Sequence, residues 1–537
     1  MQNAATIVKI NIEVTLMEKT QNNTVRLLKR WQRGLFNLLF SRMTLVILLL
    51  LLQAGMLLSV LLWLKDFLPH ILGAQFAIIF GMVLHLLNSG LDPTAKITWL
   101  MLIMATPLFG SLLYLFSLKD IGHRALRKYV KEKISSTAEI LPQSEDTLAA
   151  MENVRPGTAA LARYIYKNGG YPVFQNTAVT YFPSGEEKLH QLLIELEKAT
   201  DFIFLEYFII EEGIMWGQIL DVLIRKAAEG VDVRILYDGT CEFMLLPKGY
   251  TKKLASFGIQ CKVFSPFIPF LSTHYNYRDH RKIAVIDGHT AFTGGINLAD
   301  EYINARPKFG HWKDTAVMLK GEAAKGFSLM FLQNWTLSEK TADFSPYFPV
   351  TNAPTEGFSI PFGDQPMDSQ QVGKQVYVDM LARAQKTVCI MTPYLILDSE
   401  MENALKYAAA RGVSVKLILP GIPDKKIPYA LAKTHYAPLF EAGIEIYEYA
   451  PGFVHAKVFL CDEEEAVVGT INLDYRSLYH HFECAVYLCG GTAMAQIAKD
   501  FTHTLSKCRR IDEEALKKLS RWELALGRIC KPFAPLL

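Results

Sequence analysis

Two stretches of the sequence repeat one pattern: HRKIAVID at residues 280–287 and HAKVFLCD at residues 455–462. Both read HxKxxxxD, and each is followed by a glycine-led tetrapeptide, GGIN at 294–297 and GTIN at 469–472. Each matched residue lies 175 positions after its counterpart. One such motif is weak evidence of function, whereas two copies in register with the same downstream tetrapeptide indicate a duplicated module.

The sequence around the motifs is duplicated as well. Apolar, strand-like runs occur at corresponding places, at 202–208, 230–236, 388–394 and 412–418. Helix-like stretches alternate with them, at 189–199, 214–229, 401–411 and 429–442. Alternating strands and helices predict an α/β fold, and the repetition predicts two similar halves, residues 157–345 and 346–511.

The motifs place a histidine and a lysine together in each half. Both motifs lead into apolar sequence and are therefore expected to be strands, on which residues two apart share a face. His280 and Lys282 should then project together, as should His455 and Lys457. If the halves meet, one histidine can attack a shared phosphate, the other can move protons, and the lysines can hold its oxygens. The pattern treats the histidines alike, so it leaves the nucleophile open.

The other motif residues are expected to support this chemistry. Asp287 and Asp462 complete the two motifs, but their opposite strand parity favours structural hydrogen bonding over proton transfer. The amides of Asn297 and Asn472 can donate to the phosphate. The remaining supporting positions in the tetrapeptides are Gly294, Gly295, Gly469 and Thr470. No acidic ligand cluster accompanies either motif, so we expect neither a metal nor a cofactor.

A carboxylate behind each imidazole would fix its tautomer and offset its positive charge. Asp314 and Glu483 are the candidates, since each lies in a strand-like run at the end of its half.

The N-terminal part of the chain is expected to lie in a membrane. Residues 43–64 contain no charged side chain and are long enough to cross the hydrocarbon layer. Residues 71–88 and 97–116 are further candidate spans, the last interrupted by Pro107. Basic residues flank this region on both sides, which leaves two or three crossings open. The expected order is a cytoplasmic segment at 1–42, a transmembrane region at 43–118 and a juxtamembrane helix and linker at 119–156, with a helical tail at 512–537.

The chain resembles the bacterial cardiolipin synthases of the phospholipase D superfamily. The resemblance is carried by the paired motifs with GGIN and GTIN, and by the blocks NYRDHRK, GTINLDYRS and DPTAKITWL. It implies transmembrane helices followed by a pseudo-twofold pair of phospholipase D-like α/β/α sandwich halves. It also implies that His280 forms a phosphatidyl-histidine, that His455 is the acid and base, and that Asp314 and Glu483 support them.

The implied reaction transfers a phosphatidyl group from one phosphatidylglycerol to another, giving cardiolipin and glycerol. The expected partners are phosphatidylglycerol, cardiolipin and the bilayer. A net charge of +3 argues against nucleic acid. The protein should be a multi-pass cell-membrane protein with a cytoplasmic catalytic domain, which suits eight cysteines without metal-ligand spacing. The alternatives are a phospholipase D hydrolase, another phosphatidyltransferase and, disfavoured by two complete motifs, a non-catalytic lipid-binding protein.

Some residues near the motifs have two interpretations. Glu206 and Tyr207 are either part of the site, as the resemblance implies, or satisfied core residues. Arg278 and Arg281 can meet a second headgroup phosphate, but exposed arginines on a solvated face are favoured. His481 stands where the family commonly has asparagine, and we interpret it as a local substitution and not as a third catalytic histidine.

Overall fold

The computed structural model describes residues 51–52, 54–55, 58–59, 68–119, 123–137, 139–265, 277–337, 343–351, 353–354, 356–367 and 370–536. The described chain forms two compact units. The smaller unit contains α4 (Leu68–Leu87) and α6 (Pro107–Lys119), and α5 (Pro93–Ala105) has residues in both units. The larger unit contains both HxKxxxxD motifs.

The predicted spans have different outcomes. Of residues 43–64, only 51–52, 54–55 and 58–59 are among the described residues. Residues 71–88 form α4, whereas 97–116 are divided between α5 and α6, because Pro107 has no N–H to continue the first helix. Among the described residues, no helix combines the length and the apolar character that a membrane crossing requires.

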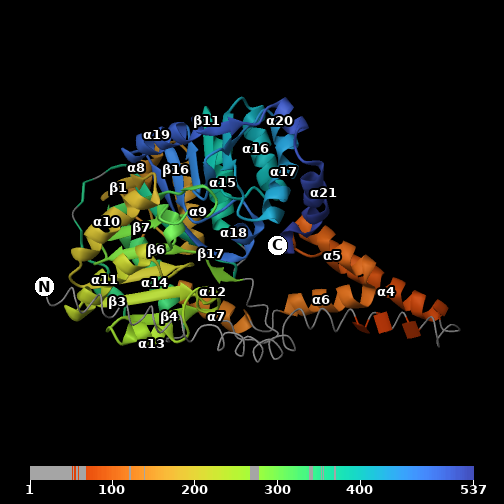
Figure 1. The fold of residues 1–537 in the computed structure, drawn as a ribbon, viewed down its shortest axis with the longest axis horizontal. Coiled ribbons are helices and arrows are strands. Elements are labelled where there is room, and N and C mark those ends of the chain that lie inside the picture. The colour runs from red at the N-terminus through yellow and green to blue at the C-terminus, as the bar shows by residue number, and fades with distance from the viewer. Residues whose placement is uncertain are drawn as a thin grey trace. The chain divides into compact units, whose positions relative to one another are not determined.

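The first half of the larger unit is built on a seven-stranded sheet of order β1-β9-β7-β6-β2-β3-β4 (Figure 1). Its strands are β1 (Thr177–Phe182), β2 (Phe202–Tyr207), β3 (Asp232–Asp238), β4 (Gln260–Phe264), β6 (Lys282–Ile286), β7 (Thr290–Gly294) and β9 (Ala316–Gly321). Its helices are α10 (Gly185–Glu197), α11 (Ile214–Ala228), α12 (Gly239–Met244), α13 (Tyr250–Ala255) and α14 (Ala324–Trp335). Every residue of β2 is buried, as expected for a central strand covered on both faces.

The second half repeats this order in the path β10-β17-β16-β15-β11-β12-β13, with β18 added at the edge. The strands are β10 (Phe358–Asp364), β11 (Thr387–Met391), β12 (Ser414–Pro420), β13 (Glu445–Tyr449), β15 (Val458–Cys461), β16 (Glu465–Gly469), β17 (His481–Cys489) and β18 (Cys508–Arg510). The helices are α15 (Val372–Arg383), α16 (Ser399–Ala410), α17 (Lys426–Glu441), α18 (Tyr475–Tyr479) and α19 (Ala493–Leu505). The predicted α/β fold with two similar halves is therefore confirmed.

The two halves share a hydrophobic core and exchange short strands. Phe331 of α14 packs in the same cluster as Val285 of β6 and Phe362 of β10. The strand β5 (Arg278–Asp279), just before the first motif, pairs in parallel with β17 of the second half. Reciprocally, β14 (Gly452–Val454), just before the second motif, pairs in parallel with β8 (His311–Lys313) of the first half. Through these pairings, His280 lies beside β17 of the second half and His455 lies beside β8 of the first half.

Further helices flank the halves. On the N-terminal side they are α7 (His123–Thr137), α8 (Glu145–Val154) and α9 (Thr158–Gly169); on the C-terminal side they are α20 (Glu513–Lys517) and α21 (Arg521–Cys530). The C-terminal α21 packs on α17, where a Cβ on Gly527 would lie 2.2 Å from the Ala430 carbonyl oxygen. Only glycine allows this approach.

Candidate active site

Each motif histidine is held by a carboxylate from the other half. His280 Nδ1 lies 3.0 Å from both carboxylate oxygens of Glu483. His455 Nδ1 lies 2.7 Å from Asp314 Oδ2. All four side chains are buried. The sequence points to these two carboxylates, but it does not indicate that they cross between the halves.

The exchanged strands fix the backbone of both histidines. His280 N donates to the carbonyl of Phe482 at 2.9 Å, and His455 N donates to the carbonyl of Lys313 at 2.7 Å. In both cases the accepting residue directly precedes the supporting carboxylate. The imidazole and its carboxylate are thus placed by the same backbone pairing, once in each direction.

Each motif lysine is hydrogen-bonded to the backbone carbonyl of the histidine two residues before it. Lys282 Nζ donates to the His280 carbonyl at 2.5 Å, and Lys457 Nζ donates to the His455 carbonyl. Burial lowers the pKa of Lys282 to about 8 and the pKa of Lys457 to about 7, although Glu483 and Asp314 oppose the shift.

The two motifs also act on each other electrostatically. The positive charge of Lys282, in the first half, contributes to lowering the pKa of His455 and of Lys457 in the second half. The histidines, lysines and carboxylates therefore belong to one electrostatic environment.

Burial sets the protonation states of the histidines and their supporting carboxylates. It lowers the pKa of His280 to about 3 and the pKa of His455 to about 4, against the opposing effect of their carboxylates. Burial alone would raise the pKa of Glu483 and Asp314, but the partner histidines outweigh it and lower both. At neutral pH the site therefore holds two neutral imidazoles and two ionised carboxylates. Each Nδ1 carries the proton toward its carboxylate, which leaves the Nε2 lone pair free to react.

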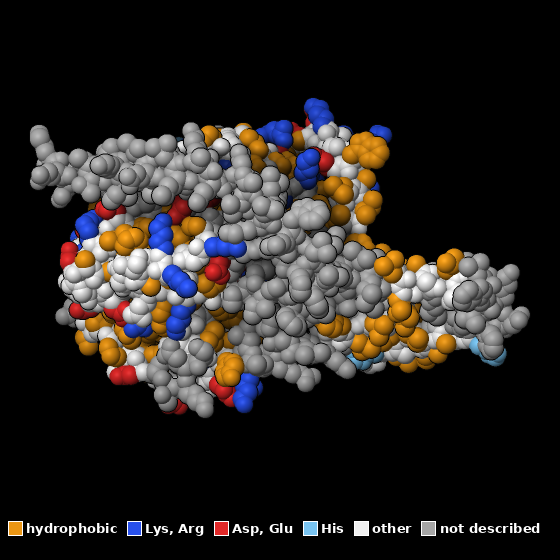
Figure 2. Space-filling view, turned by 60° about the horizontal axis from the view of Figure 1, so that its bottom comes forward, with side chains coloured by type: hydrophobic (Ala, Val, Ile, Leu, Met, Phe, Trp, Pro, Cys, Tyr) orange, Lys and Arg blue, Asp and Glu red, His pale blue; other side chains and the backbone are white. Residues whose placement is uncertain are grey.

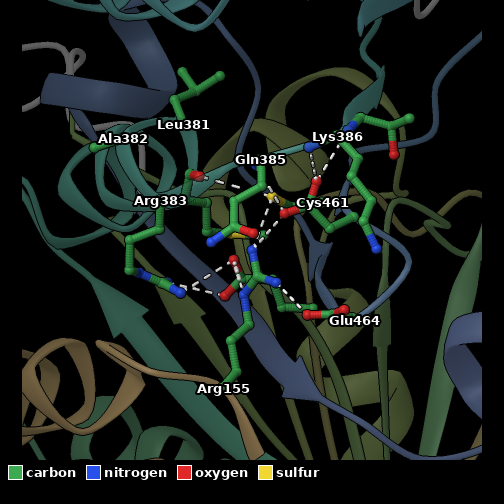
Figure 3. A network of polar contacts seen from close by, with 12 residues as sticks. Arg155, Leu381, Ala382, Arg383, Gln385, Lys386, Cys461 and Glu464 are labelled. Atoms are coloured by element: carbon green, nitrogen blue, oxygen red, sulfur yellow. Dashed lines mark hydrogen bonds and ion pairs between the residues drawn. The ribbon is translucent and has the colours of Figure 1, made fainter. Parts of the chain in front are cut away.

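The motif aspartates make the contacts of structural acceptors. The Asp287 carboxylate accepts from the backbone N–H groups of Thr200, Asp201 and Phe202, each at 2.9 Å. Asp462 accepts equivalent bonds from residues 385–387 at 2.7 to 2.9 Å, and it also binds Arg155 at 2.8 Å. Figure 3 shows the Arg155 guanidinium within this network. These bonds tie the end of each motif strand to the start of its neighbour.

The two tetrapeptides contact the supporting carboxylates differently: Gly295 leaves space for Asp314, whereas Thr470 donates a hydrogen bond to Glu483. A Cβ on Gly295 would lie 2.0 Å from Asp314 Oδ1, and one on Gly294 would lie 2.3 Å from the Thr315 carbonyl oxygen. In the second half Gly469 is equally confined, since a Cβ there would lie 2.4 Å from the Cys484 carbonyl oxygen. Thr470, the counterpart of Gly295, directs its hydroxyl to the Glu483 carboxylate.

The two asparagines differ in their contacts. Asn297 Oδ1 accepts from the backbone N–H of Ile209 at 3.0 Å, and its Nδ2 donates to the Tyr302 hydroxyl at 2.7 Å. Asn472 Oδ1 is buried and has no hydrogen-bond partner among the described residues. Both polar atoms of the Asn297 amide are therefore hydrogen-bonded within the first half, whereas the Asn472 carbonyl oxygen is not hydrogen-bonded to any described residue.

Aromatic side chains surround the histidines, and sequence reasoning identified only His481 among them. The rings of Tyr302, Trp312 and Phe453 lie 5.4, 5.4 and 5.9 Å from the ring of His455, measured between centroids. Trp312 and Phe453 each stand two residues before a site residue on an extended segment, a spacing that could have indicated a shared face. The ring of His280 is approached by Phe208 at 5.1 Å and by His481 at 5.5 Å.

The arginines beside His280 are not exposed, so the expectation of a solvated face is wrong. Arg278 and Arg281 are 4% and 3% exposed. Arg281 Nε donates to the Glu483 carbonyl at 3.2 Å, and its Nη1 lies 3.8 Å from Glu206 Oε1. Exchange of β5 into the second half buries both side chains.

Glu206 and Tyr207 are both buried and bonded. Glu206 accepts from Asn334 Nδ2 at 2.7 Å, and the Tyr207 hydroxyl accepts from Lys188 Nζ at 3.0 Å. The contact of Tyr207 agrees with its interpretation as a satisfied core residue, whereas Glu206 Oε2 is buried and has no hydrogen-bond partner among the described residues.

Comparison with known proteins agrees with this arrangement. Residues 192–322 and 377–505, one stretch in each half, match the family described as cardiolipin synthase, PLD-like domain. A cardiolipin synthase of Halalkalibacterium halodurans is 32% identical over 473 residues, which cover 86% of this chain and 92% of that protein. The chain belongs to the cardiolipin synthase family. The family resemblance predicted from the paired motifs is thus confirmed, together with the phosphatidyltransferase class of enzyme.

Other comparisons extend this result. A cardiolipin synthase of Geobacillus kaustophilus is 34% identical over 447 residues, 82% of this chain and 88% of that protein. Residues 77–117 match the family described as phospholipase D-nuclease N-terminal. The crystal structure of the phosphatidylserine synthase of Haemophilus influenzae has a TM-score of 0.54 at 15% identity, covering 70% of this chain and 97% of that one. That likeness concerns the fold alone.

Proposed function

We propose that this member of the cardiolipin synthase family transfers a phosphatidyl group from one phosphatidylglycerol to a second, through a covalent bond to histidine. The observation that carries the proposal is the pair of neutral, buried imidazoles, each oriented by a carboxylate of the other half.

In the first displacement, His280 Nε2 attacks the phosphorus, because its Nδ1 is bound to Glu483. The family resemblance assigns the nucleophile to His280. The free site holds His455 neutral, but a bound phosphodiester anion raises its pKa, so that its Nε2 takes up a proton when the substrate binds. His455 then donates this proton to the departing glycerol oxygen.

In the second displacement, a hydroxyl of another phosphatidylglycerol attacks the phosphatidyl-histidine, and His455 removes its proton. One phosphodiester replaces another, so no nucleotide is needed. Each lysine ammonium gives one proton to its histidine carbonyl and keeps two for phosphate oxygens. The lysines can therefore stabilise the charge that develops on the phosphoryl group.

The transferase and a hydrolase differ in the molecule that accepts the phosphatidyl group: a second phosphatidylglycerol in the first case and water in the second. The purified enzyme is incubated with vesicles of phosphatidylglycerol as the only lipid, and the products are resolved by mass spectrometry. We expect cardiolipin and free glycerol in equal amounts. Phosphatidic acid as the main product would instead identify a hydrolase.

Membrane attachment through the N-terminal region, with the catalytic halves in the cytoplasm, belongs to the same proposal. Phe76 and Phe80 of α4 and Met104 of α5 are 69%, 66% and 65% exposed. Figure 2 shows apolar side chains at the surface of these helices. Such surfaces suit lipid contact. Carbonate extraction of membranes tests whether the protein is attached to the membrane. Protease protection in inverted vesicles tests whether the catalytic halves face the cytoplasm.

A further inference from the structure

His481 is a polar residue of the site that the transfer reaction does not use. Its side chain is 9% exposed, and neither ring nitrogen has a hydrogen-bond partner among the described residues. Buried polar groups are normally satisfied, so an unpartnered imidazole beside a nucleophile indicates a missing ligand.

The position of His481 follows from the strand exchange. His481 and Glu483 are two residues apart on β17 and therefore share a face. The parallel pairing of β5 with β17 brings His280 to the same place. One ligand atom from each of the three residues can be chosen so that all lie within 4.8 Å of one another.

The distances fit a small metal ion. Ligands at about 2.0–2.1 Å from a tetrahedral Zn²⁺ lie about 3.3 Å from each other. The Glu483 carboxylate lies 3.0 Å from His280 Nδ1 and 3.6 Å from His481 Nδ1. These two distances lie on either side of the required value, and the chosen ligand atoms of the two imidazoles lie within 4.8 Å of each other.

The chemistry of the three ligands also fits. Two imidazoles and one carboxylate form a zinc ligand set with one position left open. Metal binding requires a neutral imidazole, which has one ring nitrogen free to bind the ion. The Thr470 hydroxyl supports the Glu483 carboxylate from behind. The nearby charge of Lys282 opposes a cation and so limits the affinity.

His481 also lines a pocket, together with Pro366, Ser477 and Tyr479. The described residues that line this pocket include neither His280 nor His455. The two ring nitrogens of His481 are themselves buried.

We propose that His280, His481 and Glu483 bind Zn²⁺ or a similar divalent transition metal, and that this ion inhibits the enzyme. An ion on His280 Nδ1 needs the lone pair of that nitrogen, so the imidazole proton must move to Nε2. The Nε2 lone pair, which attacks phosphorus in the proposed function, is then lost. Binding itself is independent of the proposed function, whereas inhibition rests on it.

Cobalt is the probe, because tetrahedral Co²⁺ has an intense visible absorption. Metal-free full-length enzyme in detergent is titrated with Co²⁺ and then with Zn²⁺. His481→Asn removes one ligand, and His503→Asn, at an exposed position on α19, is the matched control. We expect wild type and His503→Asn to bind one Co²⁺ that Zn²⁺ displaces, and His481→Asn to bind it at least about tenfold more weakly.

Inhibition is measured in parallel, with each variant referred to its own rate in the presence of a chelator. Zn²⁺ should suppress cardiolipin formation by wild type and His503→Asn, and at least about tenfold more Zn²⁺ should be needed for His481→Asn. Equal Co²⁺ binding by His481→Asn and wild type, or no tetrahedral Co²⁺ signal in wild type, would overturn the metal site. A normal Co²⁺ signal in a protein that makes no cardiolipin would instead count against the proposed function.

Discussion

Replacing Glu483 with glutamine tests the support of His280 most directly. When His280 attacks phosphorus its ring becomes positively charged, 3.0 Å from the Glu483 carboxylate. With an effective dielectric constant of about 20, Coulomb's law gives an attraction of about 5 kcal/mol at this distance. Glutamine retains a hydrogen bond of about 1 kcal/mol, so about 4 kcal/mol is lost from the transition state. We therefore expect kcat to fall about 10³-fold.

The assay is the initial rate of cardiolipin formation from phosphatidylglycerol vesicles, with circular dichroism to verify folding. Glu441→Gln, at the exposed C-terminal end of α17, is the control and should retain the wild-type rate. A folded Glu483→Gln enzyme within tenfold of wild type would refute the electrostatic support of His280. Accumulation of phosphatidyl-histidine on the variant would show that the second displacement, and not the first, had become slow.

Three further predictions concern pH, packing and stability. Because burial lowers the pKa of His280 to about 3, its imidazole stays neutral well below pH 6.5. The acid limb of the profile of kcat/KM against pH, where His280 gains a proton, should hence lie below 6.5; an acid limb at or above 6.5 contradicts the burial argument. Gly295→Ala places a methyl group 2.0 Å from Asp314 Oδ1, so activity should fall at least about 100-fold, whereas Gly217→Ala, with nothing within 4 Å, should retain it; equal rates would exclude the packing argument. Asp287→Ala removes the acceptor of three backbone N–H groups and should lower the free energy of unfolding by about 3 kcal/mol, measured by thermal denaturation; an unchanged transition would argue against a structural role.

The paired motifs predicted the fold well, because the duplication is explicit in the sequence. Residues 280–287 and 455–462 contain the equivalent strands β6 and β15, although both motif histidines precede the strand, and the predicted strand runs at 202–208 and 388–394 became β2 and β11. These strands are central and wholly or largely buried, so they appear in the sequence as short continuous apolar runs.

The exchange between the halves could not be predicted. The strands that carry it are short: β5 contains two residues and β8 contains three, too few for any periodic pattern. Asp314 is closer in sequence to His280 than to His455, yet it binds the second. The burial of Arg281 was missed for the same reason, since part of its surroundings comes from β17 of the other half.

The reciprocal placement of Asp314 and Glu483 makes neither half sufficient by itself. A separated N-terminal half would carry His280 without Glu483, and a separated C-terminal half would carry His455 without Asp314. A single-copy ancestor with this topology could have completed its reaction centre only by associating with an identical molecule about a twofold axis. Gene fusion would then have made that partnership permanent, and would have freed positions 295 and 470 to become different residues.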